Sequence, residues 1–162
     1  MIIKGLIKTT LLDYPGKIAC TIFLFGCNMR CGFCHNPDLV IDPSGKRYEG
    51  TRYSEEEILA FLEKRKNYLD GVCITGGEPL LSLKIDFLRK IKQIKNNKDN
   101  QIDNNNNDQN KSNSNNSNYS IKIDTNGTSP DKLKEIINEG LVDYIAMDIK
   151  GSKEKYKDII SF

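Results

Sequence analysis

The segment "IACTIFLFGCNMRCGFCHNP", residues 18–37, joins an apolar run to a loop rich in cysteine. Residues 18–25 are mainly aliphatic and aromatic, which predicts a buried β-strand. Cys27, Cys31 and Cys34 follow, and His35, the only histidine of the chain, comes directly after them. We therefore expect a strand whose carboxyl end carries a loop of thiols.

The three cysteines have the spacing C-x3-C-x2-C, and thiolates are soft ligands suited to iron–sulfur clusters or zinc. Structural zinc sites use four ligands, often as two separated pairs. Three cysteines on a cubane cluster would leave one iron open to bind a substrate directly. Two alternatives stay open: a Cys3His zinc site completed by His35, which would strain the loop, and three unrelated buried thiols.

The rest of the chain alternates between strand and helix patterns, which predicts a parallel sheet covered by helices. Cys20 and Cys73 fall inside predicted strands and are expected to be small core residues. The predicted strands are residues 18–25, 71–75, 119–125 and 142–149, and the predicted helices are residues 54–69, 84–95, 129–140 and 152–160.

Four polar motifs follow predicted strands. The cysteine loop, "TGGEP" at 75–79, "DTNG" at 124–127 and "DIKG" at 148–151 each lie where a strand ends. Active sites of parallel sheets lie at the carboxyl ends of their strands. The sequence therefore predicts one site built from all four motifs.

Length and composition favour a single globular domain of 162 residues. The asparagine-rich tract at 96–118 has too few apolar residues to fold and is predicted to be a disordered insertion. The N-terminus lacks a signal-peptide pattern and no apolar run could span a membrane, so we expect a cytoplasmic protein with reduced cysteines. A net charge of +2 does not indicate nucleic-acid binding.

The motifs resemble those of the radical S-adenosylmethionine (radical SAM) enzymes. C-x3-C-x2-C with Phe33 before the third cysteine, followed by "TGGEP", matches the family's two motifs in order and spacing. Residues 10–40 are similar to activating proteins of glycyl radical enzymes, particularly the anaerobic ribonucleoside-triphosphate reductase activators. The resemblance implies an α/β fold, a partial (βα) barrel, here truncated to about four βα units.

The resemblance also implies a [4Fe–4S] cluster and S-adenosylmethionine as cofactors. Cys27, Cys31 and Cys34 would hold the cluster, and Gly76, Gly77 and Glu78 would receive the methionyl ammonium group. The remaining expected contacts with S-adenosylmethionine are weaker matches: Asp124, Asp148, Lys150 and, on the adenine side, Phe33, His35 and Asn36.

The implied reaction is reductive cleavage of S-adenosylmethionine, which generates a glycyl radical on a partner enzyme. The expected partner is the anaerobic ribonucleoside-triphosphate reductase, and the expected electron donor is flavodoxin or ferredoxin. Two alternatives stay open. One is a radical SAM enzyme with a small-molecule substrate, similar to 7-carboxy-7-deazaguanine synthase, and the other is a non-catalytic metal-binding fragment.

Overall fold

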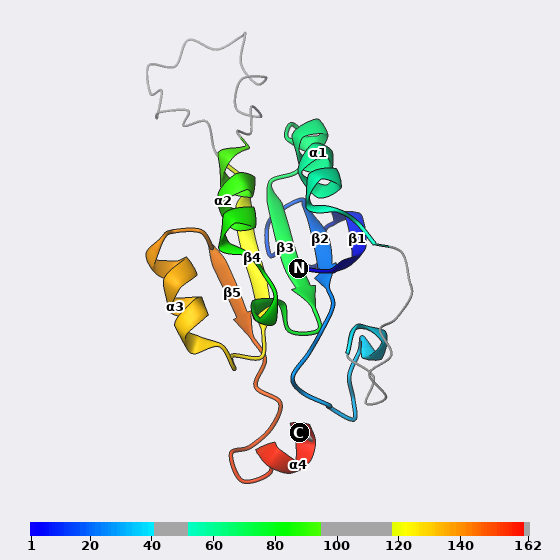
Figure 1. Cartoon of the computed structure of the whole chain (residues 1–162), viewed down its shortest axis with the longest axis vertical. Coiled ribbons are helices and arrows are strands. Elements are labelled where there is room, and N and C mark those ends of the chain that lie inside the picture. Colours follow the sequence, from blue (N-terminus) through cyan, green and yellow to red (C-terminus); the bar gives the residue numbers. More distant parts are fainter. Residues whose placement is uncertain (41–51, 95–117, 161–162) are drawn as a thin grey trace.

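The computed structural model describes residues 1–40, 52–94 and 118–160. Within them, a five-stranded sheet has the order β1-β2-β3-β4-β5, in which β2 to β5 are parallel (Figure 1). The predicted insertion at 96–118 lies outside the described residues, apart from Asn118. The strands are β1 (Ile3–Thr10), β2 (Ala19–Leu24), β3 (Gly71–Gly76), β4 (Ser120–Thr125) and β5 (Tyr144–Met147).

Each parallel strand is followed by a helix, which confirms the predicted α/β class and its four βα units. The carboxyl ends of β2 to β5 meet at one edge of the sheet, where α4 lies (Figure 1). No helix in the described part of the chain is long and apolar enough to cross a membrane. The helices are α1 (Glu55–Arg65), α2 (Ile85–Gln93), α3 (Pro130–Asn138) and α4 (Tyr156–Ile160), with short 3-10 turns η1 (Pro37–Leu39) and η2 (Pro79–Leu81).

Strand β1 is absent from the sequence-based prediction. It pairs antiparallel with β2 and is mostly half-buried or exposed after Lys4. Lys4 and Lys8 interrupt the apolar pattern that would otherwise mark a strand. Pairing with β2 therefore selects the extended conformation here, and local sequence does not.

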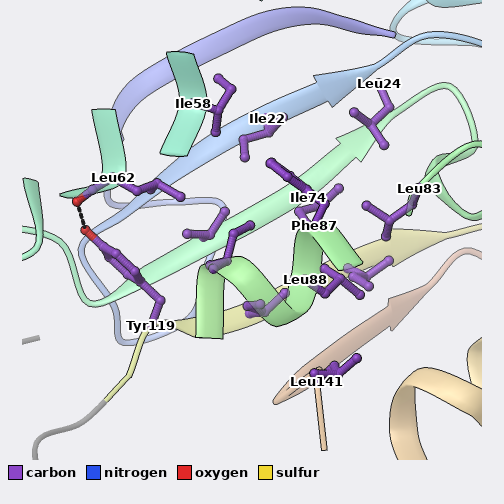
Figure 2. Packing of buried hydrophobic residues seen from close by; sticks show 14 of the residues in the cluster. Ile22, Leu24, Ile58, Leu62, Ile74, Leu83, Phe87, Leu88, Tyr119 and Leu141 are labelled. Carbon is purple, nitrogen blue, oxygen red and sulfur yellow. Dashed lines mark hydrogen bonds between the residues drawn. The ribbon is translucent and has the colours of Figure 1, made fainter. Parts of the chain in front are cut away.

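The hydrophobic core fills the face of the sheet covered by α1, α2 and α3. Ile22, Ile74 and Ile123 lie side by side on β2, β3 and β4 and are fully buried. Figure 2 shows the helix residues that pack against the sheet, including Ile58, Leu62, Phe87 and Leu88. Cys20 belongs to this core, as predicted.

Helix boundaries agree with the predictions in most places. The Ser54–Glu57 capping box of α1 is present, with Ser54 Oγ accepting from Glu57 N at 3.0 Å. Ser129 stands at the N-cap of α3, but its side chain makes no capping bond. Ile137 of α3 is 48% exposed, whereas Leu133 and Ile136 are buried. Helix α4 begins at Tyr156, later than the predicted residue 152.

The opposite face of the sheet is polar. Strand register places Thr21, Cys73, Lys122 and Tyr144 in one row across β2 to β5. Successive side chains of a strand point to opposite faces, and Ile22, Ile74 and Ile123, which follow the first three of these residues, face the core. The row therefore points away from the helices. Cys73 is fully buried, but it lies in this polar row and is absent from the apolar core cluster. Cys73 is therefore a small buried residue, as predicted, but its neighbours are polar.

The end of β3 lies unusually close to the end of β2. Gly76 has a φ of +130°, and a Cβ atom there would stand 2.1 Å from Leu24 O. A Cβ atom on Gly77 would stand 2.2 Å from Gly26 O. Backbone bonds use this proximity, because Gly77 N donates to Leu24 O and Glu78 N donates to Gly26 O at 2.7 Å. The two glycines thus hold the cysteine loop against β3.

Tyr119→Phe should lower the free energy of unfolding by about 1 kcal/mol, because the buried hydroxyl donates to Leu62 O at 2.8 Å (Figure 2). Urea unfolding followed by circular dichroism measures the change. Tyr68→Phe is the control, since Tyr68 is 62% exposed. Equal midpoints for the two variants would contradict the assigned role of the hydroxyl.

Gly77→Ala should destabilise the fold by about 1–3 kcal/mol, because the new methyl group overlaps the carbonyl of Gly26. Gly32→Ala is the matched control, since a Cβ atom there meets nothing within 4 Å. Thermal unfolding of both variants without cofactors makes the comparison. A Gly77→Ala variant as stable as Gly32→Ala would show that the close approach does not constrain this position.

Candidate functional site

A pocket of about 380 Å³ opens at the carboxyl edge of the sheet, within the usual size range for small-molecule sites. It is lined by residues from the cysteine loop, the end of β3, the end of β4 and the segment after β5. The four motifs that follow predicted strands therefore meet at one site, as the sequence analysis predicted.

Eleven of the twelve residues predicted from sequence line this pocket, and Glu78 does not. Residues that line it but were not predicted include Met29, Thr75, Thr125 and Asn126. Their place beside the predicted motifs is the signal that could have identified them. The predicted residues that line the pocket are Cys27, Cys31, Phe33, Cys34, His35, Asn36, Gly76, Gly77, Asp124, Asp148 and Lys150.

The cysteine loop is fixed by backbone contacts at its start and in its middle. Gly26 N donates to Leu39 O at 2.8 Å, which closes the loop across η1. Arg30 N donates to Ile160 O at 2.7 Å, which joins the loop to the last residue of α4. The Arg30 guanidinium also donates to the carbonyl oxygen of Cys27 at 2.8 Å. The loop is thus ordered by elements far away in the sequence.

The three thiols of the loop are half-buried. Burial raises the pKa of the Cys27 thiol, although a hydrogen bond from Met29 N at 3.3 Å opposes the rise. In the described part of the chain, no three His, Cys, Asp or Glu side chains converge on one metal-ion position. A [4Fe–4S] cluster does not need such convergence, because each thiolate binds a different iron. Three soft donors beside a pocket therefore fit a cluster better than a single ion.

Asp148 and Lys150 bring opposite charges to the pocket. Lys150 Nζ lies 2.6 Å from Asp148 Oδ2 and 6.0 Å from the centre of the Phe33 ring. Burial lowers the pKa of Lys150, but the hydrogen bond and charge of Asp148 outweigh burial, so the pKa is raised. Lys150 thus stays a cation facing the cysteine loop, where it can pair with an anionic ligand group.

Asp124 is held by two residues that sequence reasoning missed. The Lys122 ammonium, whose residue is only 7% exposed, forms an ion pair with Asp124 Oδ1, and the Cys73 thiol lies 3.5 Å from Asp124 Oδ2. Burial, together with the charge of Asp124, raises the pKa of Cys73 to about 12, so Cys73 stays a neutral thiol. Period-2 alternation in "SIKIDT" places Lys122 and Asp124 on one face and could have indicated this pair.

Glu78 lies behind the pocket, and its exposed fraction is 1%. Its carboxylate accepts three hydrogen bonds, from Leu80 N at 3.0 Å, from Thr125 Oγ1 at 2.8 Å and from Asn126 N at 2.6 Å. These contacts satisfy a buried charge, which would otherwise be costly. The geometry thus gives Glu78 a supporting place between β3 and the turn after β4, and offers little free carboxylate for a ligand.

Two curated relatives are activating enzymes. A glycyl-radical enzyme activating enzyme from Methanocaldococcus jannaschii is 30% identical over 161 residues, which cover 98% of this chain and 54% of the relative. The pyruvate formate-lyase-activating enzyme of Listeria monocytogenes is 41% identical over 81 residues, which cover 48% of this chain and 29% of the relative. The chain thus spans at most about half the length of these relatives.

Among solved structures, the crystal structure of QueE from Escherichia coli aligns with 78% of this chain and 53% of that chain. Its TM-score of 0.48 and identity of 22% are too low to support an argument about function. The model of the radical SAM superfamily matches residues 21–161, which include all four motifs of the pocket. This chain therefore belongs to the radical SAM superfamily, whose enzymes use a [4Fe–4S] cluster and S-adenosylmethionine.

Proposed function

We propose that this chain is the radical SAM domain of a glycyl-radical enzyme activating enzyme that works in the reducing cytoplasm. The observation that carries the proposal is the pocket, in which three thiols, two adjacent glycines and the charges of Asp124, Asp148 and Lys150 lie together. Similarity to activating enzymes over 98% of the chain supports this choice within the superfamily.

Each group of pocket residues has a separate task in the proposal. Cys27, Cys31 and Cys34 hold the cluster on one wall of the pocket. Gly76 and Gly77 expose their backbone, so that the methionyl part of S-adenosylmethionine can approach closely. The proposed contacts with its other polar groups and with adenine come from Asp124, Asp148, Lys150, Phe33, His35 and Asn36.

Charge placement favours one orientation of the ligand. Asp124 is the anion at the end of β4 and can accept from an ammonium or a hydroxyl group. Lys150 is the cation beside the cysteine loop and can pair with a carboxylate. Glu78 was expected to accept the ammonium group directly, but its buried contacts suit it better to orienting Thr125 and Asn126.

When bound, the cluster and S-adenosylmethionine together supply the radical chemistry that removes a hydrogen atom from a glycine Cα of the partner. The contribution of the chain is to fix the two cofactors beside each other. Apolar residues such as buried Met29 and half-buried Ala146 also line the pocket, and they limit the access of water. An external one-electron donor, flavodoxin or ferredoxin, completes the proposed system.

The proposed partner is the anaerobic ribonucleoside-triphosphate reductase, on the resemblance of residues 10–40 to activators of that enzyme. The test incubates the anaerobically reconstituted chain with a reductant, S-adenosylmethionine and either this reductase or pyruvate formate-lyase. Electron paramagnetic resonance (EPR) then measures a glycyl radical on each partner. A radical on the reductase supports the proposal, and a radical on the lyase alone overturns the choice of partner. Cleavage of S-adenosylmethionine without a radical on either protein would overturn the proposed activity.

Each of the variants Cys27→Ala, Cys31→Ala and Cys34→Ala should fail to hold the [4Fe–4S] cluster, because a loop with two thiolates cannot retain it. Iron and sulfide content after anaerobic reconstitution, with EPR of the reduced protein, measures the effect. Cys20→Ala is the matched control, since Cys20 lies in the apolar core and does not line the pocket. Retention of a full cluster by any loop variant would remove that cysteine from the ligand set.

Asp124→Asn should weaken S-adenosylmethionine binding about tenfold, the loss expected for one charge-assisted hydrogen bond, while leaving the cluster intact. The change in the EPR spectrum of the reduced cluster on titration with S-adenosylmethionine reports the affinity. Asp131→Asn, at an exposed position of α3, is the control. Wild-type affinity in Asp124→Asn would show that Asp124 does not contact the ligand.

A further inference from the structure

Three side chains close a ring of hydrogen bonds between the cysteine loop and the turn after β4. Asn28 Nδ2 donates to Thr128 Oγ1 at 2.9 Å, and the Thr128 hydroxyl donates to Asn126 Oδ1 at 2.7 Å. Asn126 Nδ2 donates back to Asn28 Oδ1 at 3.0 Å. Every donor meets an acceptor and the direction is the same around the ring, an arrangement in which the bonds strengthen one another.

Buried Glu78 holds the segment that carries Asn126. Asn126 N donates to Glu78 Oε2 at 2.6 Å, and the neighbouring Thr125 hydroxyl donates to Glu78 Oε1 at 2.8 Å. Glu78 and Thr125 are 1% and 2% exposed, so water does not compete for these bonds. The buried carboxylate therefore fixes the turn to which Asn28 attaches.

Asn28 lies inside the cysteine loop, directly after Cys27 and three residues before Cys31. Backbone contacts from Gly26 N and Arg30 N hold the loop on either side of Asn28, and the Arg30 guanidinium donates to Cys27 O within the loop. Asn28 adds a side-chain contact between them, directed at the pocket wall that carries Asp124. This contact sets the distance between the thiol loop and the carboxyl end of β4.

We infer that Asn28 is a positioning residue, which through Asn126 and Glu78 holds the cysteine loop in the geometry that retains the cluster. The inference rests on the proposed function, because it assumes that the loop binds a [4Fe–4S] cluster. The amide is suited to this task because one group supplies both the donor and the acceptor that the ring requires. A carboxylate keeps only the acceptor, and an alanine keeps neither.

The test compares Asn28→Ala, Asn126→Ala and the double variant with the wild-type chain after anaerobic reconstitution. The rate of cluster loss to an iron chelator is followed by visible absorbance, and urea unfolding measures stability without cofactors. Each single variant should lose its cluster about tenfold faster, because it removes two of the three hydrogen bonds of the ring. The double variant should lose it no faster than either single variant, because both act through the same ring.

Two further variants separate positioning from general stability. Asn28→Asp keeps the acceptor for Asn126 and should retain the cluster better than Asn28→Ala, while Asn67→Ala, at an exposed site, should match the wild type. In the cofactor-free chain, amide hydrogen exchange over residues 27–34 should rise in Asn28→Ala and the unfolding midpoint should stay within the range of Asn67→Ala.

The outcomes distinguish failure of the inference from failure of the proposed function. A wild-type chain that takes up no cluster overturns the proposed function and this inference together. A wild-type chain that holds a cluster, with Asn28→Ala losing it at the wild-type rate, overturns the inference alone. Additive losses in the double variant, or losses that follow the unfolding midpoint, also overturn it, because they indicate independent or general destabilisation.

Discussion

The backbone contact between Gly77 and Gly26 is the constraint on which the site depends. No side chain fits on Gly77, since a Cβ atom there would stand 2.2 Å from Gly26 O. This approach lets Glu78 N bond the loop carbonyl and brings the first residues of the cysteine loop against the end of β3. The glycines of "TGGEP" therefore have a packing role that is independent of any bound ligand.

Polar groups support the pocket at two places near this contact. Beneath the pocket, the polar row of the sheet pairs Lys122 with Asp124 beside the neutral thiol of Cys73. Behind the pocket, buried Glu78 orients the turn after β4 through Thr125 and Asn126. Both arrangements satisfy buried charge with nearby partners, so the charges that face the pocket are held without a ligand.

Much of this organisation could be predicted from local patterns. Apolar runs predicted β2 to β5, the strand and helix patterns predicted α1, and the spacing of the cysteines predicted a ligand loop. Each pattern is local, so the residues that form it are sufficient to indicate the element. Strand β1 could not be predicted, because its lysines interrupt the pattern and its conformation comes from pairing with β2.

Hydrogen bonds between side chains of different strands and loops could not be predicted either, because they also depend on contacts between distant parts of the chain. Asn126 is 48 positions from Glu78 and 98 positions from Asn28 in the chain, yet the three residues share one hydrogen-bond network. The resemblance implied that Glu78 receives the methionyl ammonium group, and in the structure this carboxylate is buried and accepts hydrogen bonds from the turn after β4.

The sequence by itself determined the fold class, the order of the βα units and the ends of strands at which polar motifs gather, because these follow from short-range periodicity and from the rule that parallel strands share one carboxyl edge. The tertiary structure alone decided which polar groups face the pocket and which support it. Lys122, Asn28 and Glu78 have their roles because packing brings distant strands and loops within hydrogen-bonding distance, and no local pattern encodes that distance.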